Sequence, residues 1–492
     1  MVAWLELIGR KQIFTDEAEV NSENIYKIIS EAMQIHEENL KEIKYLRNYV
    51  KGKQPILSRE KEIRPEINIK TVFNRAAQIV EFKLNYEFGS PITFVQRSKD
   101  DGSEGEIDDK AVAKLNELLN YANKPSVDLQ IARDMKTCGV GYRLIEPSTK
   151  KNRLIKTTAL NPETTFVVYR NDAYREPILG VTYFQSKNGN IRYSAYSNDT
   201  RYEFSVPLVS DQKNSSVFPV VYPNIVGEIP IVEYINDHER MSSFERVISL
   251  IDSLNLANSD RLNDIAQHVQ SLLWLNNADI ESDDVVKLRE YGIIKTKSSN
   301  GINATVSYVE SVLNQSEVQT LVDYINDQID IIANVPGRQE TGGGSTGSAM
   351  NLSNGWQAAE IAAKGMEPIF TESERRTLDV IDGIIQNSEN VPDELININM
   401  MDIDPKFSRN KTYDLATKCS SLAALLNVGV DGLTAFTVVG LFTDPQLAWN
   451  NSKEAVEKIR LSGKKVTNSD VSNIVQNTSG QPSKVSNVDE GA

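Results

Sequence analysis

Apolar side chains recur every three or four residues along much of this 492-residue chain, which is the spacing of one face of an α-helix. The first such stretch predicts a helix over about residues 21–50. A basic, proline-containing loop follows at 51–65. Residues 68–94 then predict a helix that Gly89 and Pro91 break, followed by a strand.

The stretch 242–269 predicts a long helix whose two sides differ in chemistry. Ser242 and Glu245 have the spacing of a capping box at its start. Polar residues, among them Ser259 and Asn263, occupy one side of the helix. The other side is an apolar stripe made of Phe244, Val247, Ile251, Leu254, Leu262, Ile265 and Val269.

Residues 316–335 predict a second amphipathic helix, which Pro336 ends. Its apolar stripe consists of Val318, Leu321, Ile325, Ile329 and Ile332. Three acids at helical spacing, Asp323, Asp327 and Asp330, lie on the opposite face, a pattern typical of a solvated surface. Two such helices can pair as antiparallel legs, but a lone pair leaves much apolar surface in water, which indicates an oligomer.

Strand-like alternation dominates from Gly141 to Tyr234. Asn188-Gly189 separates two aromatic, β-branched runs in this region, which predicts a hairpin. Asn300-Gly301 does the same between the two amphipathic helices and predicts a small α/β insertion there. The chain is therefore expected to fold as α+β, mainly helical.

The most glycine-dense stretch, "PGRQETGGGSTGSAMNLSNG", follows the second amphipathic helix at residues 336–355. A long helix comes next, with Gly365 and Pro368 inside it. Pro368 lacks a backbone N–H and clashes with the Lys364 carbonyl, so we expect a kink near Gly365. Helices are again predicted at about 413–461, and the polar tail from Thr467 is predicted to be disordered.

The composition is ordinary for a soluble globular protein, but the net charge is −15 and the pI is about 5.0. This charge argues against a protein that coats DNA with a basic face. It suits a protein that DNA passes, because tight phosphate binding depends on Lys and Arg. No apolar run approaches the roughly 18 residues of a membrane span. Cys138 and Cys419 are expected to be buried small residues rather than disulfide partners.

No convincing catalytic or metal-binding constellation is found. The glycine-rich stretch lacks the lysine of a phosphate-binding P-loop and follows a helix rather than a strand. The three histidines, His36, His238 and His268, have no His or Cys neighbour at metal-ligand spacing. Asp402 and Asp404 resemble a carboxylate pair, but two exposed acids at a strand end are the simpler interpretation. No cofactor or metal is expected.

Four stretches, in this order, resemble segments of the portal protein of tailed bacteriophages, in the group found in long-tailed phages of Gram-positive hosts. These are "NRAAQIVEFKLNYEFGSPITF", "NIVGEIPIVEYIND", "SLIDSLNLANSDRLNDI" and "TGSAMNLSNGWQAAEIAAKGME". The resemblance covers about residues 24–460. The order of the four stretches along the chain carries the resemblance.

The resemblance implies a portal-protein fold with an α/β wing, a two-helix stem, a small α/β clip and a helical crown. The implied boundaries are wing 1–240, first stem helix 241–269, clip 270–315, second stem helix 316–335, tunnel loop 336–354, kinked helix and wing return 355–400, crown 401–466 and disordered tail 467–492. Members of the family form a ring of about twelve subunits around a tunnel, closed by head-to-tail contacts. Packaged DNA enters and ejected DNA leaves through this tunnel.

On this interpretation the glycine-rich stretch is a tunnel loop that faces the duplex. Candidate DNA-facing residues are Arg338, Ser345, Thr346, Asn351 and Lys364. The acids Asp323, Asp327 and Asp330 either line the tunnel or pair with Lys or Arg of a neighbouring subunit; the sequence leaves both open.

The implied partners are a homo-oligomeric ring, double-stranded DNA, the terminase large subunit, a head–tail adaptor, and the major capsid and scaffolding proteins, with no membrane. The implied location is the portal vertex of the virion, after assembly in the host cytoplasm. The alternatives are another phage head or connector protein and, less favoured, a nucleotide- or metal-dependent enzyme.

Overall fold

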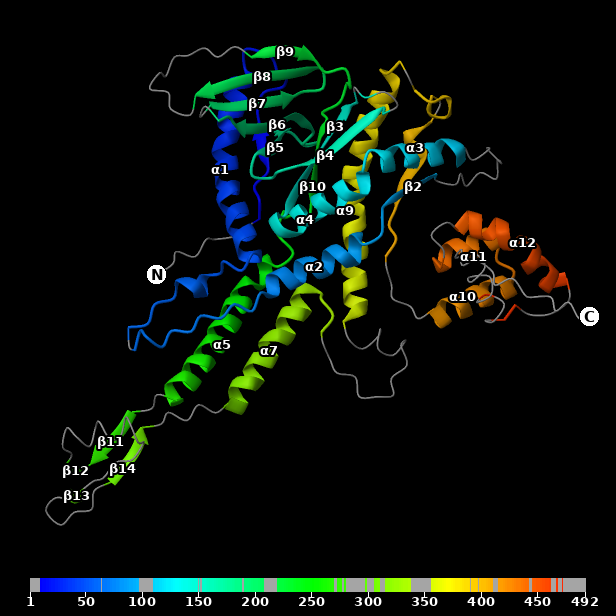
Figure 1. Cartoon of the computed structure of the whole chain (residues 1–492). Coiled ribbons are helices and arrows are strands. Elements are labelled where there is room, and N and C mark those ends of the chain that lie inside the picture. Colours follow the sequence, from blue (N-terminus) through cyan, green and yellow to red (C-terminus); the bar gives the residue numbers. More distant parts are fainter. Residues whose placement is uncertain are drawn as a thin grey trace, which may run out of the picture. The chain divides into compact units, whose positions relative to one another are not determined.

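The structure is a computed structural model of the whole chain (Figure 1). It describes residues 9–62, 64–96, 109–148, 150, 153–187, 190–207, 219–269, 272–276, 278–279, 297–298, 305–309, 315–337, 355–389, 391–396, 398–409, 415–441, 445–461, 466–467 and 471. The chain divides into two compact units, residues 1–409 and 410–492. Both helices and strands are well represented, so the fold is mixed α and β, as expected.

A six-stranded sheet with one covering helix forms one part of the first unit. Its strand order is β1-β5-β6-β7-β8-β9, and only β1 runs parallel to its neighbour. The strands are β1 (Ile13–Thr15), β5 (Thr165–Arg170), β6 (Pro177–Gln185), β7 (Asn190–Tyr196), β8 (Thr200–Pro207) and β9 (Val220–Pro223). Helix α1 (Ile25–Val50) packs on this sheet because its buried isoleucines meet the inward side chains of β5 and β6. The predicted turn Asn188-Gly189 lies outside the described residues, although β6 and β7 on either side of it pair antiparallel.

A second, three-stranded sheet lies at the centre of the largest core of this unit. Its order is β10-β3-β4, with β3 (Val140–Pro147), β4 (Ile155–Leu160) and β10 (Ile231–Ile235). Around it pack α2 (Arg75–Phe88), α3 (Asp109–Tyr121), α4 (Lys124–Cys138) and the long α9 (Trp356–Gln386). Cys138 at the end of α4 is buried and free, as predicted.

A short ladder between β2 (Thr93–Gln96) and β15 (Ile403–Lys406) returns the chain to this core after α9. Phe94 and Ile403 contribute to the same apolar cluster. The boundary between the two units therefore follows Arg409, whereas the resemblance implies a crown that begins at residue 401. Backbone pairing between segments about 310 residues apart has no signature in local sequence patterning.

Helices α5 (Ile248–Val269) and α7 (Gln315–Ala333) form the expected pair, and the chain enters α5 through a 3₁₀ turn at Glu245–Val247. Phe244, Val247, Ile251 and Leu254 are buried against α7, α2 and the end of α1. One half of the predicted capping box forms, because the Glu245 carboxylate accepts the Ser242 N–H at 2.8 Å. Figure 1 shows the two helices side by side, running in opposite directions.

The segment between α5 and α7 contains paired strands in its described part. β11 (Leu272–Asn276) pairs antiparallel with β14 (Thr305–Val309), and β12 (Ala278–Asp279) pairs with β13 (Lys297–Ser298). β14 includes Val306 and Tyr308, in the region where a small α/β insertion is predicted. The turn Asn300-Gly301 lies outside the described residues.

The second unit is helical where it is described. It contains α10 (Leu415–Val428), α11 (Gly432–Val439) and α12 (Pro445–Leu461), packed around Leu422, Phe436 and Val456. Gly429 and Gly440 have positive φ and end α10 and α11, and Asp431 caps the start of α11 at Gly432. Cys419 is buried here. No helix in the described part of the chain is long and apolar enough to cross a membrane.

Candidate functional site

The two ends of the glycine-rich stretch meet at one point of the first unit. Helix α7 ends in a Schellman motif, in which Asn334 has a φ of 53° and Val335 donates to the Asp330 carbonyl at 2.9 Å. Gly355, with a φ of 80°, begins α9, and a Cβ there would lie 3.4 Å from the Cα of Pro336. The chain therefore leaves and re-enters the described body at the same place. The candidates Arg338, Ser345, Thr346 and Asn351 lie outside the described residues.

An aromatic cluster holds the start of α9 at this point. Trp356 packs on Phe82 and Tyr86 of α2, with ring centroids 5.7 and 5.8 Å away. The Tyr86 hydroxyl donates to Glu360 at 2.5 Å, and Arg409 bonds Glu360 at 3.1 Å. Aromatic packing and a charge-assisted bond together fix the first two turns of α9 against α2.

The structure corrects the expected row of three exposed acids on α7. Asp330 is partly buried, beside Gly337, and forms an ion pair with Arg75 of α2. Burial raises the pKa of Asp330 above its ordinary value, with Arg75 opposing the shift. Asp323 and Asp327 are exposed as expected, and Asp323 accepts a bond from the Gln319 amide at 2.7 Å. Asp330 therefore anchors α7 to α2, a role that its helical spacing did not reveal.

Lys364, Gly365 and Pro368 all lie on the exposed side of α9. The ammonium of Lys364 is 3.8 Å from the Glu360 carboxylate, and its side chain is 65% exposed. Helix α9 is assigned as one helix from Trp356 to Gln386 with Pro368 inside it. A kink near Gly365 stays a prediction.

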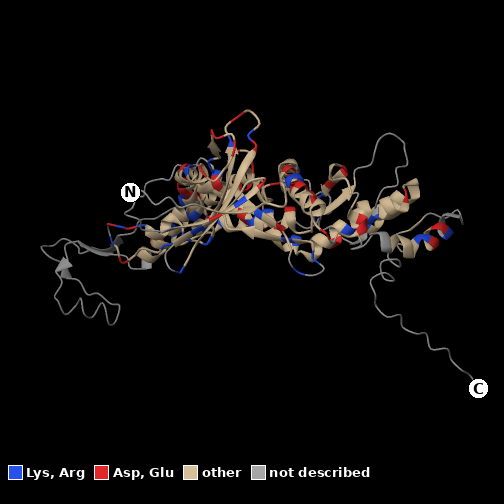
Figure 2. Ribbon diagram, turned by 90° about the horizontal axis from the view of Figure 1, so that it is seen from above, with Lys and Arg blue, Asp and Glu red and all other residues tan. Residues whose placement is uncertain are grey.

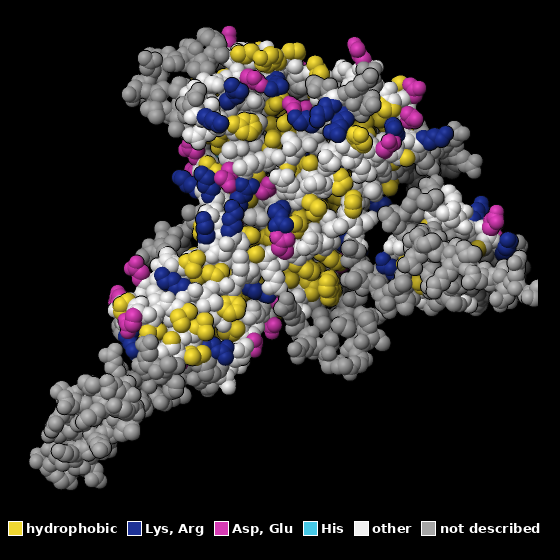
Figure 3. Space-filling model, viewed as in Figure 1, with side chains coloured by type: hydrophobic (Ala, Val, Ile, Leu, Met, Phe, Trp, Pro, Cys, Tyr) yellow, Lys and Arg dark blue, Asp and Glu magenta, His cyan; other side chains and the backbone are white. Residues whose placement is uncertain are grey.

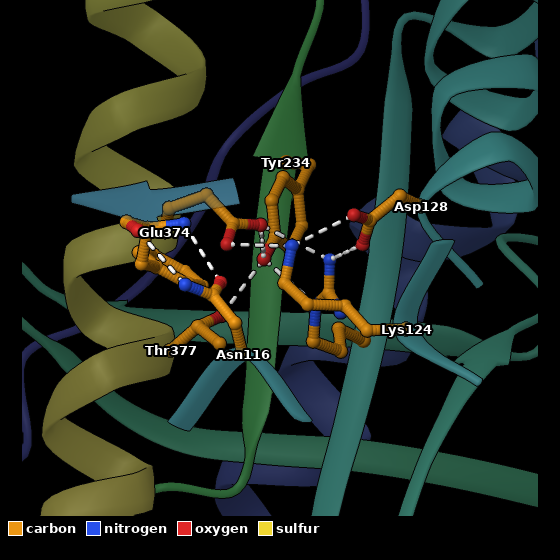
Figure 4. Close-up of polar contacts among 8 residues, drawn as sticks. Asn116, Lys124, Asp128, Tyr234, Glu374 and Thr377 are labelled. Carbon is orange, nitrogen blue, oxygen red and sulfur yellow. Dashed lines mark hydrogen bonds and ion pairs between the residues drawn. The ribbon is translucent and has the colours of Figure 1, made fainter. Parts of the chain in front are cut away.

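Further along α9, Glu374 enters a buried group of charges that sequence reasoning missed (Figure 4). Its carboxylate lies 3.1 Å from both Arg143 of β3 and Lys124 of α4, and it accepts the Tyr234 hydroxyl at 2.8 Å. Asp128 completes the group, 2.7 Å from Lys124 and 2.5 Å from Arg143. Two cations thus meet two carboxylates, so the formal charges cancel inside the core.

The pKa values of Asp128 and Tyr234 reflect the opposing effects of burial and of the neighbouring charges. Burial acts to raise the pKa of Asp128, but Arg143 and Lys124 outweigh it and hold that pKa below its ordinary value. Burial raises the pKa of the Tyr234 hydroxyl well above its ordinary range, so it stays a donor. Only the i, i+4 spacing of Lys124 and Asp128 hinted at a pair, because the other members come from distant segments.

The second correction concerns α5, which buries several polar side chains between Asn255 and Asn263. Ser259 and Asn255 are fully buried and Asn263 is 2% exposed, whereas Leu262 and Ile265 of the predicted apolar stripe are 39% and 49% exposed. The polar side chains bond the backbone of the segment between α1 and α2. On α7, Leu321 and Ile332 of the predicted stripe are also exposed.

Two features of the described residues bear on the enzymatic alternative. Among them, no group of three or more His, Cys, Asp and Glu residues could hold a metal ion. A cavity of about 300 Å³ lies near β5, β6 and α9. Its charged lining consists of Glu176, Glu228, Glu233, Asp379 and Arg376, a mostly anionic set that would repel a phosphate. Over the described elements as a whole, acidic and basic residues are interspersed (Figure 2).

Comparison with known proteins gives two findings. A family model described as "Phage portal protein, SPP1 Gp6-like" matches residues 30–460. The portal protein of Bacillus phage SPP1 is 21% identical over 299 residues, an alignment that covers 55% of this chain and 54% of that protein. The chain thus spans about half the length of the curated relative it matches.

Proposed function

The chain belongs to the SPP1 Gp6-like family of phage portal proteins, and from this premise we propose that it forms a ring-shaped channel for double-stranded DNA at one capsid vertex. The proposed ring contains about twelve copies related by head-to-tail contacts. It would admit DNA during packaging and release it at ejection. The terminase large subunit, the head–tail adaptor and the capsid and scaffolding proteins are its proposed partners, first in the host cytoplasm and then in the virion.

Apolar surface on the helix pair is the observation that carries this proposal. Seven large apolar side chains of α5 and α7 are between 39% and 65% exposed. They are Leu256, Leu262 and Ile265 on α5, and Leu321, Tyr324, Ile331 and Ile332 on α7. Apolar side chains gather over this region of the surface (Figure 3). An apolar surface of this extent favours association, since burying each side chain is worth up to about 2 kcal/mol.

The glycine-rich stretch supplies the proposed contact with DNA. In residues 338–354 Arg338 is the only cation, and hydroxyl and amide side chains such as Ser345, Thr346 and Asn351 offer weak contacts. Weak contacts from many copies suit a duplex that must slide. Each phosphate that a Lys or Arg neutralises strengthens binding, so a loop with many cations would hold the DNA too tightly. The contacts of Asp330 and Trp356 at the two ends of this stretch support a fixed mounting for each copy of the loop.

Negative-stain electron microscopy of the purified full chain tests the ring. We expect rings with a central hole wide enough for a DNA duplex. Particles without a hole, or with a hole too narrow for duplex DNA, would contradict the proposed channel.

Shortening the glycine-rich stretch tests the loop separately. Deleting Gly342–Gly344 should block DNA packaging and leave rings intact, because the loop would no longer reach the duplex. Replacing the same three glycines by serines keeps the length and serves as the matched control. Normal phage yield from the deletion would defeat the assignment of the loop.

A further inference from the structure

The segment between α1 and α2 is fastened to α5 by a ladder of side-chain bonds. Asn263, Ser259 and Asn255 accept the backbone N–H groups of Ile69, Thr71 and Phe73 at 2.6, 3.0 and 2.7 Å. The spacing fits, because four helical residues rise about 6 Å and two extended residues span about 6.6 Å. The helix thus pairs with the extended segment much as a neighbouring strand would.

This ladder fixes a surface that is both basic and apolar. Residues 51–74, hereafter the basic segment, contain six Lys and Arg residues against three Glu residues, in a chain whose net charge is −15. Leu57, Ile69 and Phe73 are 41% to 45% exposed on it. Lys51 and Lys53 are also exposed. Gly52, between them, lies beside Asn74, so the two lysines are near the end of the segment that carries Phe73.

Helix α7 carries a surface of the opposite charge. Its 19 residues include Glu317, Asp323, Asp327 and Asp330 and contain no Lys or Arg. Its apolar residues Leu321, Tyr324, Ile331 and Ile332 are exposed, and the exposed acids Glu317 and Asp327 flank Tyr324 at seven and three residues. We call the face that carries these six exposed side chains the acidic strip; it consists of Glu317, Leu321, Tyr324, Asp327, Ile331 and Ile332.

The two surfaces lie on opposite sides of α5. The ladder residues bond the basic segment, whereas Leu254 packs toward α7, about 140° around the helix from Ser259. Figure 1 shows α5 between the basic segment and α7. One chain therefore cannot bring the basic segment and the acidic strip together.

We propose that the basic segment of one copy receives the acidic strip of α7 from the next copy, an inference that rests on the proposed ring. Complementary charge orients the contact, and the apolar side chains of the two surfaces cover one another. Because the surfaces differ and lie on opposite sides, the contact is head-to-tail and repeats around a ring. Asp327 and Glu317 then pair between subunits, and the buried ladder serves to hold the receiving surface rigid.

Charge reversal on each surface tests the pairing. One full-length variant carries Lys51→Glu with Lys53→Glu, and the other carries Glu317→Lys with Asp327→Lys. Each alone juxtaposes like charges, so the concentration for half-assembly, measured by sedimentation, should rise about tenfold or more. In an equimolar mixture every contact between the two variants has opposite charges, so assembly should return with the variants alternating.

A control variant with Lys150→Glu and Lys156→Glu has the same change of net charge as the Lys51→Glu, Lys53→Glu variant, at exposed positions away from both surfaces. It should assemble like the parent chain. Circular dichroism and thermal unfolding confirm that each variant is folded before the comparison. Unchanged assembly of both reversed variants, or no recovery in their mixture, would overturn the inference and leave the ring standing. A parent chain that never assembles would instead refute the proposed function.

Discussion

The core around Glu374 and the helix pair α5–α7 differ in whether their unfavourable groups are satisfied within one chain. At Glu374 four charges from α4, β3 and α9 are removed from water and paired within the same chain. On α5 and α7 seven large apolar side chains stay at least 39% exposed. A buried charge without a partner and an exposed apolar surface are both unfavourable in free energy. Within this chain the buried charges are paired, whereas the apolar side chains of the helix pair stay exposed. The core is complete within one chain, whereas in the proposed ring a neighbouring subunit covers the helix pair.

The largest expected effect comes from removing one charge of the buried group around Glu374. Glu374→Gln leaves Lys124 and Arg143 with one carboxylate, so the free energy of unfolding should fall by about 3–5 kcal/mol. Urea unfolding of the full chain measures it. Glu372→Gln, two residues away in an exposed pair with Arg376, is the matched control and should change by less than about 1 kcal/mol. Equal effects of the two variants would contradict the importance of the buried group.

A second test measures how the stability of the core beneath α1 depends on pH. His36 is buried between Phe166 and Tyr183, and burial lowers its pKa to about 4 from 6.5. Between these two values only the unfolded chain binds the proton, so stability should fall as the pH falls through this window. From about pH 7.5 to about pH 5 the loss should be about 2 kcal/mol.

Urea midpoints at the two pH values measure this loss. His36→Phe keeps an aromatic ring in the site and should lose this part of the pH dependence. The same dependence in the parent and in His36→Phe would show that the proton binds elsewhere.

A smaller effect is expected where the helix pair meets the body. Asn263→Ala removes both bonds to the Ile69 backbone and should weaken the attachment of the basic segment by about 1–2 kcal/mol. Limited trypsin digestion after Lys61 and Lys70 should then become about tenfold faster. Asp264→Ala, the adjacent position, is the control. A cleavage rate unaffected by Asn263→Ala would mean that the ladder does not hold the segment.

Periodicity predicted the elements of the helix pair because their burial repeats along the chain. Phe244, Val247, Ile251 and Leu254 are in the core as expected. The same rule failed at Ser259 and Asn263, which are buried because an extended segment about 190 residues earlier supplies their partners. It failed at Asp330 because Arg75 is 255 residues away.

The buried charges show the same limit. Glu374, Arg143 and Lys124 come from three elements, and no local pattern distinguishes a glutamate that will be buried from one that will be solvated. Helix α9 itself was predicted, and so was its position after the glycine-rich stretch. The predicted site residues Arg338, Ser345, Thr346 and Asn351 lie outside the described residues, so their role stays a prediction.

The mass of the particle formed by the full chain tests most directly whether neighbours complete the helix pair. Mass photometry should find about twelve times 55.0 kDa for the parent chain, and a single 55.0 kDa species for Tyr324→Ser with Ile331→Ser. These side chains are 61% and 65% exposed, so thermal unfolding of the variant should match that of a dissociated parent chain. A parent chain that stays at 55.0 kDa under all conditions, or a variant that assembles like the parent, would contradict the account.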